Sequence, residues 1–375
     1  MEMWEKSRVH SPRPEFCRTQ QRQTNILVCR IFFTRRVGGI GALNFRKLYL
    51  NKKMIKTNTK QHTLGLILLS MTAIVWGAGF VLNDQLLDAT FYKTPALLNA
   101  LRFGISTLCL LAVFNKKIRF NKQILLYSGL GGVLLFVGFL LQTIGQKYTA
   151  PSHSGFFTAS YVMFVPFIGW IAYKKCPRWF SFVGVALAVI GLVVLNFKND
   201  DMGAKNILLG DVLTLLCAVM FAVQIFWTEY SLRSNKVDFV QLTFWQIAIA
   251  AVLFILYSAI FESKYYTSMT FDVSYCWWRL LIVIFGGTAF AYYSQTFAQM
   301  HLNATESSLI MACESPIGAF LSMVLLIEPF SWQTTVGGLL VIAAVILVEV
   351  APTIVHKKHH PTNDITTDDT ENGGS

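Results

Sequence analysis

The chain has 375 residues, of which 54% are hydrophobic and only 14% are charged. A soluble domain carries about 25% charged residues, so this composition excludes an ordinary soluble protein and indicates a polytopic membrane protein. The net charge is +12, but residues 1–62 hold 14 Lys and Arg against three acids and account for +11 of it. The charge therefore belongs to one tail, which excludes a nucleic-acid-binding surface spread along the chain.

Residues 1–62 form a basic segment that we expect to be disordered. Its one apolar run, 26–33, is interrupted by Arg30 and is too short to span a bilayer. Met54 begins a short polar leader directly before the first long apolar run. One hypothesis is that Met54 is the true start, in which case residues 1–53 are an upstream extension that is not translated.

From residue 63 onward the sequence predicts ten apolar helices, most of them long enough to cross a hydrocarbon core of about 30 Å. The predicted helices cover residues 63–82, 95–114, 124–146, 152–173, 179–196, 207–229, 239–261, 276–298, 304–327 and 332–351. This pattern predicts an all-α integral membrane protein with ten transmembrane helices. The polar tail, 352–375, is expected to be disordered.

The chain contains an internal repeat. Residues 142–196 align with residues 295–349 without a gap, and the identical pairs include Gln142/Gln295, Gln146/Gln299, Trp179/Trp332 and Gly184/Gly337. Lys174 and Lys175 of the first copy fall on Ile327 and Glu328 of the second, so the positive charge is lost in the second copy. Because Lys and Arg favour the cytoplasmic side, this predicts two inverted five-helix repeats, at 63–196 and 207–351.

Charges in the loops predict the topology. With the N-terminus inside, the inner loops carry 11 Lys and Arg and the outer loops carry five. This excess predicts that both termini lie in the cytoplasm. We also expect a multi-pass protein of the cell (inner) membrane.

Several short motifs follow one another in the order found in one transporter family. They are Trp76-Gly77-Ala78-Gly79-Phe80, Arg102, the stretch from Ser315-Pro316 to Glu328, and Gly337-Gly338. With two inverted halves over residues 63–351, the chain resembles an EamA-type member of the drug/metabolite transporter superfamily. The resemblance implies a carrier of small polar or amphipathic metabolites. Bacterial relatives are mostly exporters of amino acids, and eukaryotic relatives in the superfamily move nucleotide-sugars and triose phosphates.

The two copies differ in detail. Pro166 of the first copy aligns with Ala319, and Pro316 of the second aligns with Met163. The prolines are about one turn apart in register, so the two half-sites are not expected to match in detail.

Ionisable residues inside a bilayer are costly and are therefore functional candidates. Arg102 lies near the middle of the second predicted helix, with Asn99 on the same face. Glu314 lies in the middle of the ninth, beside Pro316, where the helix can open. We expect Glu314 to bind a substrate ammonium group or a coupling proton or ion. The alternative is a purely structural role, such as an ion pair between Arg102 and Glu314.

A repeated pattern of glutamines predicts a central cavity. Gln142 and Gln146 share one helix face, and Gln295 and Gln299 occupy the equivalent positions of the second copy. Glutamine is expensive in lipid, so these side chains should face protein or water. Further lining candidates are Trp76, Tyr161, Gln224 and Tyr292. The alternative is that the glutamines only join helices by hydrogen bonds.

The sequence thus favours a secondary transporter that exports small metabolites such as amino acids by alternating access around a midplane cavity. A nucleotide-sugar or organophosphate carrier is one alternative, and a non-transporting structural or receptor-like membrane protein is another. No catalytic, metal-binding or cofactor-binding motif is found, so we expect no enzyme activity, no metal and no cofactor. The expected partners are a small-molecule substrate and the lipid bilayer, with no nucleic acid and with a homodimer left open.

Overall fold

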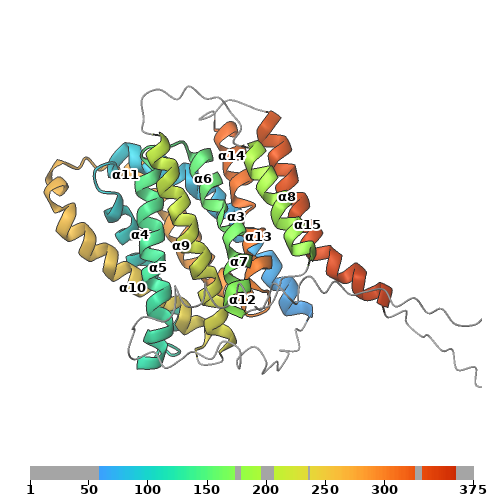
Figure 1. Cartoon of the computed structure of the whole chain (residues 1–375). Coiled ribbons are helices and arrows are strands. Elements are labelled where there is room, and N and C mark those ends of the chain that lie inside the picture. Colours follow the sequence, from blue (N-terminus) through green and yellow to red (C-terminus); the bar gives the residue numbers. More distant parts are fainter. Residues whose placement is uncertain (1–58, 174–178, 196–206, 235–236, 326–331, 360–375) are drawn as a thin grey trace, which may run out of the picture. The chain divides into compact units, whose positions relative to one another are not determined.

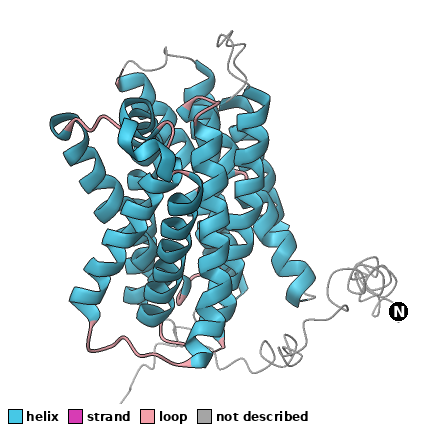
Figure 2. Ribbon diagram, turned by 90° about the vertical axis from the view of Figure 1, so that its left-hand side faces the viewer, coloured by secondary structure: helices cyan, strands magenta, loops and turns pink. Residues whose placement is uncertain are grey.

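The computed structural model describes residues 59–173, 179–195, 207–234, 237–325 and 332–359. Every regular element within these ranges is helical, as predicted (Figure 2). Eight helical segments of this described part are long and apolar enough to cross a membrane. The predictions for residues 1–58, and those that rest on Lys174, Lys175 and Glu328, lie outside the described residues.

The helices of the first copy lie over the predicted apolar runs, but the first of them continues nine residues past its predicted end at residue 82. They are α3 (Thr59–Leu86), continued by the π-helix η1 (Leu87–Phe91), then α4 (Pro95–Phe114), α5 (Lys122–Gln146), α6 (Pro151–Ala159), α7 (Tyr161–Tyr173) and α8 (Trp179–Leu195). Pro95 and Pro151 each occupy a first helical position, where a missing amide donor costs nothing. The side chain of Asn121 caps α5 by accepting from the backbone N–H of Gln123.

The second copy has more interruptions. Its elements are α9 (Ile207–Arg233), α10 (Phe239–Phe261), the 3-10 helix η2 (Ser263–Ser268), α11 (Val273–Leu281), the π-helix η3 (Ile282–Phe290), α12 (Ala291–Gln299), α13 (Ala304–Met311), α14 (Glu314–Val324) and α15 (Trp332–His359). The predicted helix 276–298 is therefore a continuous run of α11, η3 and α12. A π-helical turn inside such a run often marks a functional position.

The last predicted helix of each copy, α8 and α15, contains a shorter apolar stretch within the described residues, Ser181–Val194 and Thr335–Leu347. These two helices pack side by side (Figure 1). A Cβ atom added to Gly191 would lie 2.7 Å from the carbonyl oxygen of Gly337, so glycine permits this close approach. The total of ten transmembrane helices stays a prediction. Helix α15 also continues to His359, beyond the predicted start of the tail.

Two predicted helices are each broken near the middle. The helix expected at 152–173 is interrupted at Ser160, between α6 and α7, and the helix expected at 304–327 is interrupted at Ala312 and Cys313, between α13 and α14. Pro316 explains the second break, because it has no N–H to donate to the Ala312 carbonyl, and its ring would clash with that carbonyl in a continuous helix. Glu314 is the first residue of α14, directly after this break and in the middle of the span Ala304–Val324, so the helix is interrupted beside Pro316 as expected.

Candidate functional site

A cavity lies where the two broken helices meet α3, α4, α5, α9 and the run from η3 to α12. The empty space at this site, including open solvent at its mouth, is about 550 Å³. Its lining is Trp76, Gly79, Phe80, Asn83, Arg102, Phe139, Gln142, Thr158, Tyr161, Phe221, Gln224, Ile225, Val283, Gly287, Tyr292, Gln295 and Glu314. Both copies therefore contribute to one cavity that is mainly aromatic and amide-lined.

The structure brings together eight of the eleven residues that the sequence singles out, namely Trp76, Arg102, Gln142, Tyr161, Gln224, Tyr292, Gln295 and Glu314. Three lie outside the lining. Asn99 donates to the Thr143 hydroxyl at 2.8 Å, and Gln299 donates to the Ile225 carbonyl at 3.2 Å. Gln146 is buried one turn from Gln142 without lining the cavity. A role of any of these residues in binding stays a prediction.

Arg102 brings a buried positive charge to the cavity. Its side chain is 3% exposed, and its guanidinium carbon lies 4.9 Å from the centre of the Phe139 ring, as in a cation–π contact. The Nε atom donates to the Thr288 hydroxyl at 3.4 Å, whereas Nη1 has no hydrogen-bond partner. Because a buried guanidinium needs acceptors, the unpartnered donor is an available anchor for an anionic group.

Glu314 brings a carboxyl group to the same cavity. It is 3% exposed, and its Oε1 atom has no hydrogen-bond partner. Its place in the first turn of α14 puts the carboxyl group near the positive end of that helix. The ion pairs found among the described residues are His153–Asp211 and Glu229–Arg233, so the alternative of an Arg102–Glu314 ion pair is wrong. The two groups line one cavity without neutralising each other.

The amides of the cavity wall are partly used in hydrogen bonds between helices. Gln295 donates to Gln224 at 3.3 Å, and Gln224 donates to Gln246 at 3.2 Å. Gln142 donates to the Thr158 hydroxyl at 3.2 Å. The Oε1 atom of Gln295 stays without a partner. Gln142, Gln224 and Gln295 therefore join helices by hydrogen bonds and also line the cavity. The two interpretations of the glutamines do not exclude each other.

Aromatic rings form the rest of the wall. The indole N–H of Trp76 donates to the Gly287 carbonyl in η3 at 2.8 Å, and its ring centre lies 5.5 Å from that of Tyr292. Phe139 packs edge-on against Phe221 with ring centres 5.1 Å apart. The π-helical turn thus presents a carbonyl group that fixes the orientation of Trp76.

Sequence reasoning missed several lining residues, among them Asn83, Thr158, Phe139 and Phe221. Helical spacing would have indicated Asn83, because it follows Trp76 by seven residues and so lies on the same face of α3. Its Oδ1 atom is buried without a partner. Phe139 and Phe221 had no signal, because an aromatic residue in an apolar helix usually packs in the core or at the interface.

The described part of the chain has no group of three or more His, Cys, Asp or Glu side chains placed to hold a metal ion. The expectations that the protein binds no metal and no cofactor stay predictions.

Comparison with known proteins gives consistent results. The chain is 28% identical over 327 residues to an uncharacterized transporter of Archaeoglobus fulgidus, covering 87% of this chain and 93% of that protein. It is 19% identical over 257 residues to the uncharacterized transporter YoaV of Bacillus subtilis, covering 68% of this chain and 86% of that protein. A solved structure described only as a crystal structure of a protein shares the fold with a TM-score of 0.57 and 16% identity, covering 76% of this chain and 98% of that chain.

The model of the EamA-like transporter family matches the chain twice, at residues 63–197 and 208–350. The two matches cover most of the chain, and their description agrees with the resemblance found in the sequence. The chain therefore belongs to the EamA-like transporter family.

Proposed function

We propose that this transporter is a secondary exporter of small zwitterionic metabolites, such as amino acids and related compounds. The observation that carries the proposal is the pair of opposite ionisable groups in the cavity. Arg102 and Glu314 are both buried, each has a polar atom without a partner, and they form no ion pair with each other. An amino acid has a carboxylate and an ammonium group that would meet these two side chains.

The proposed binding mode follows from donor and acceptor chemistry. The guanidinium of Arg102 donates to the substrate carboxylate, and the carboxylate of Glu314 accepts from the substrate ammonium group. The rings of Trp76, Phe139 and Tyr292 contact the apolar part of the substrate. Desolvation makes each polar contact stronger than in water.

The transport cycle is proposed to alternate access to this cavity between the two repeats, which we take to be inverted. Glu314 also serves as the group that takes up a coupling proton or ion when no ammonium group is bound. We further propose that the protein resides in the cell (inner) membrane and that both termini face the cytoplasm. The orientation accords with the excess of Lys and Arg in the predicted inner loops.

The charges of the cavity lining do not favour a nucleotide-sugar or organophosphate carrier. Such a substrate needs several cationic groups around its phosphates. Arg102 is the one Lys or Arg among the lining residues, and Glu314 would repel a phosphate.

Reconstituted vesicles test the proposal. Counterflow of radiolabelled neutral amino acids should be abolished by Arg102→Gln and by Glu314→Gln, each of which keeps most of the side-chain volume. Arg119→Gln and Asp88→Asn, at exposed positions, are the matched controls and should leave counterflow unchanged. Wild-type counterflow in either cavity variant, with normal amounts of protein in the vesicles, would refute the assignment of that residue.

A further inference from the structure

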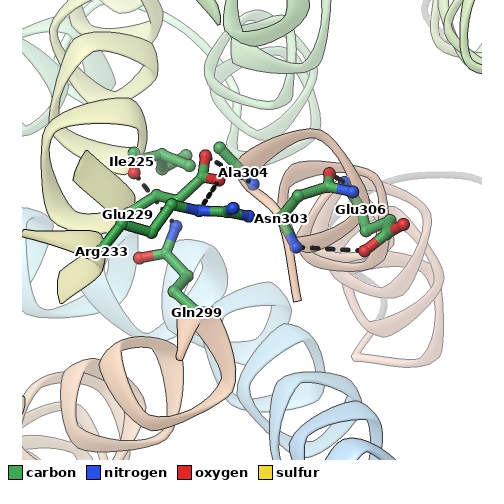
Figure 3. A network of polar contacts seen from close by, with 7 residues as sticks. All are labelled: Ile225, Glu229, Arg233, Gln299, Asn303, Ala304 and Glu306. Carbon is green, nitrogen blue, oxygen red and sulfur yellow. Dashed lines mark hydrogen bonds and ion pairs between the residues drawn. The ribbon is translucent and has the colours of Figure 1, made fainter. Parts of the chain in front are cut away.

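Helix α9 holds an acidic residue near each end, and each acid contacts the start of a different half-helix that leads to the cavity. At its C-terminal end, Glu229 is 4% exposed and accepts from the backbone N–H of Ala304 at 3.1 Å. Glu229 also forms an ion pair with Arg233, one turn further along α9. We name this contact of Glu229, Arg233 and Ala304 the Glu229 latch (Figure 3).

The Glu229 latch joins separate helices, whereas the rest of the cap at α13 is local. Asn303 and Glu306 form a capping box that satisfies the N–H of each within their own segment. Figure 3 shows Glu229 reaching the same helix start from α9, beside the hydrogen bond from Gln299 to the Ile225 carbonyl. The carboxylate of Glu229 is thus the part of this cap that ties α13 to α9.

Asp211 forms the corresponding contact at the N-terminal end of α9. The Thr149 hydroxyl, two residues before α6 begins, donates to Asp211 Oδ1 at 2.9 Å. The His153 Nδ1 atom lies 3.8 Å from the same oxygen. We name this contact of Asp211, Thr149 and His153 the Asp211 latch. Glu229 follows Asp211 by 18 positions in α9, and at 1.5 Å per residue this places the latches about 27 Å apart along the helix.

The two half-helices held in this way are equivalent in the internal repeat. At the offset of the repeat, Pro151 at the start of α6 aligns with Ala304 at the start of α13, and Ser160 aligns with Cys313. Both half-helices end at the breaks, beyond which Tyr161 and Glu314 line the cavity. A movement of either half-helix start therefore reaches the cavity through a single short helix.

We propose that the Glu229 latch and the Asp211 latch close the two ends of the access path and are released in turn during transport. This inference rests on the proposed transport function and adds the residues that control it. Release of the Glu229 latch opens the cavity toward the C-terminal end of α9, and release of the Asp211 latch opens it toward the other end. Each carboxylate acts by positioning a half-helix, without contact with the substrate.

Hydrogen–deuterium exchange of the full chain in lipid nanodiscs tests the proposal without any substrate. Glu229→Gln should raise the exchange rate of residues 299–311 by roughly tenfold or more, because a hydrogen bond to a charged group is replaced by a weaker one. Alternation also predicts slower exchange at residues 147–159 in this variant. Asp211→Asn, the matched change at the other end, should produce the opposite pattern.

A second variant tests the same contact in case Glu229→Gln does not fold. Arg233 is 45% exposed at its side chain, so Arg233→Gln removes the ion pair with little loss of packing and should give the Glu229→Gln pattern with a smaller amplitude. Reciprocal shifts at the two ends support the latches, whether or not amino acids are transported. The proposal would be overturned by faster exchange only at the mutated end, by equal changes at both ends, or by no change in any of these variants. None of these results would bear on the proposed substrate.

Discussion

Replacement of Gly77 by alanine tests the packing that places Glu314 at the cavity. A Cβ atom at Gly77 would lie 2.8 Å from the Glu314 carbonyl oxygen and 2.8 Å from the Ile317 side chain. Both distances are below van der Waals contact, and a backbone oxygen next to a helix break cannot rotate away. Helices α3 and α14 must therefore separate by several tenths of an ångström, and overpacking of this kind costs about 1–3 kcal/mol.

The matched control is Gly104→Ala in α4, where an added Cβ atom meets nothing within 4 Å. There the substitution should stabilise the helix by roughly 0.5–1 kcal/mol, because alanine loses less conformational entropy than glycine. We expect the apparent melting temperature in detergent, followed by the loss of monodisperse protein, to fall by several degrees for Gly77→Ala and not for Gly104→Ala. Similar melting temperatures for the two variants would show that α3 and α14 do not approach as described.

Three further substitutions probe local contacts. Glu262 accepts from two backbone N–H groups at the start of α4. Glu262→Ala should lower the free energy of unfolding by about 2–4 kcal/mol, and Glu262→Gln should lower it clearly less, as measured by thermal unfolding. An equal loss of stability in the two variants would rule out the capping role. Trp76→Phe removes the donor to the Gly287 carbonyl, so amide exchange of η3 should rise severalfold, and an unchanged rate would contradict this hydrogen bond. Asn303→Ala should destabilise the start of α13 by about 1 kcal/mol, measured by exchange at Glu306, and wild-type protection there would argue against the capping box.

Much of the helical framework could be predicted because length and hydropathy decide it. The apolar run at 95–114 is α4 with the predicted ends, since Pro95 fixes its start and the polar residues after Phe114 end it. The breaks were harder to predict. Pro316 indicated an interrupted helix, but the interruption lies at the carbonyl four residues earlier, so Glu314 begins a helix. The break at Ser160 has no proline at the equivalent spacing, and the sequence offered no signal for it.

The candidate site was found largely from the cost of polar groups in lipid, which marked Arg102, Glu314 and the glutamines. That argument says that such a side chain avoids lipid, and it does not say which interior surface the side chain reaches. Gln142 and Gln146 illustrate the limit, since they share a helix face and yet only Gln142 lines the cavity. The contacts of Glu229 and Asp211 could not be predicted, because each acid lies near an end of α9 and its partners on other helices are far away in the sequence.

The most direct test of the proposed function is counterflow in reconstituted vesicles with three matched compounds. They are a neutral amino acid, its amide, which lacks the carboxylate, and its deaminated acid, which lacks the ammonium group. Our account predicts protein-dependent uptake of the amino acid and little uptake of the two analogues, because each leaves Arg102 or Glu314 buried without its partner. Equal uptake of all three, or uptake no greater than in protein-free vesicles, would contradict it.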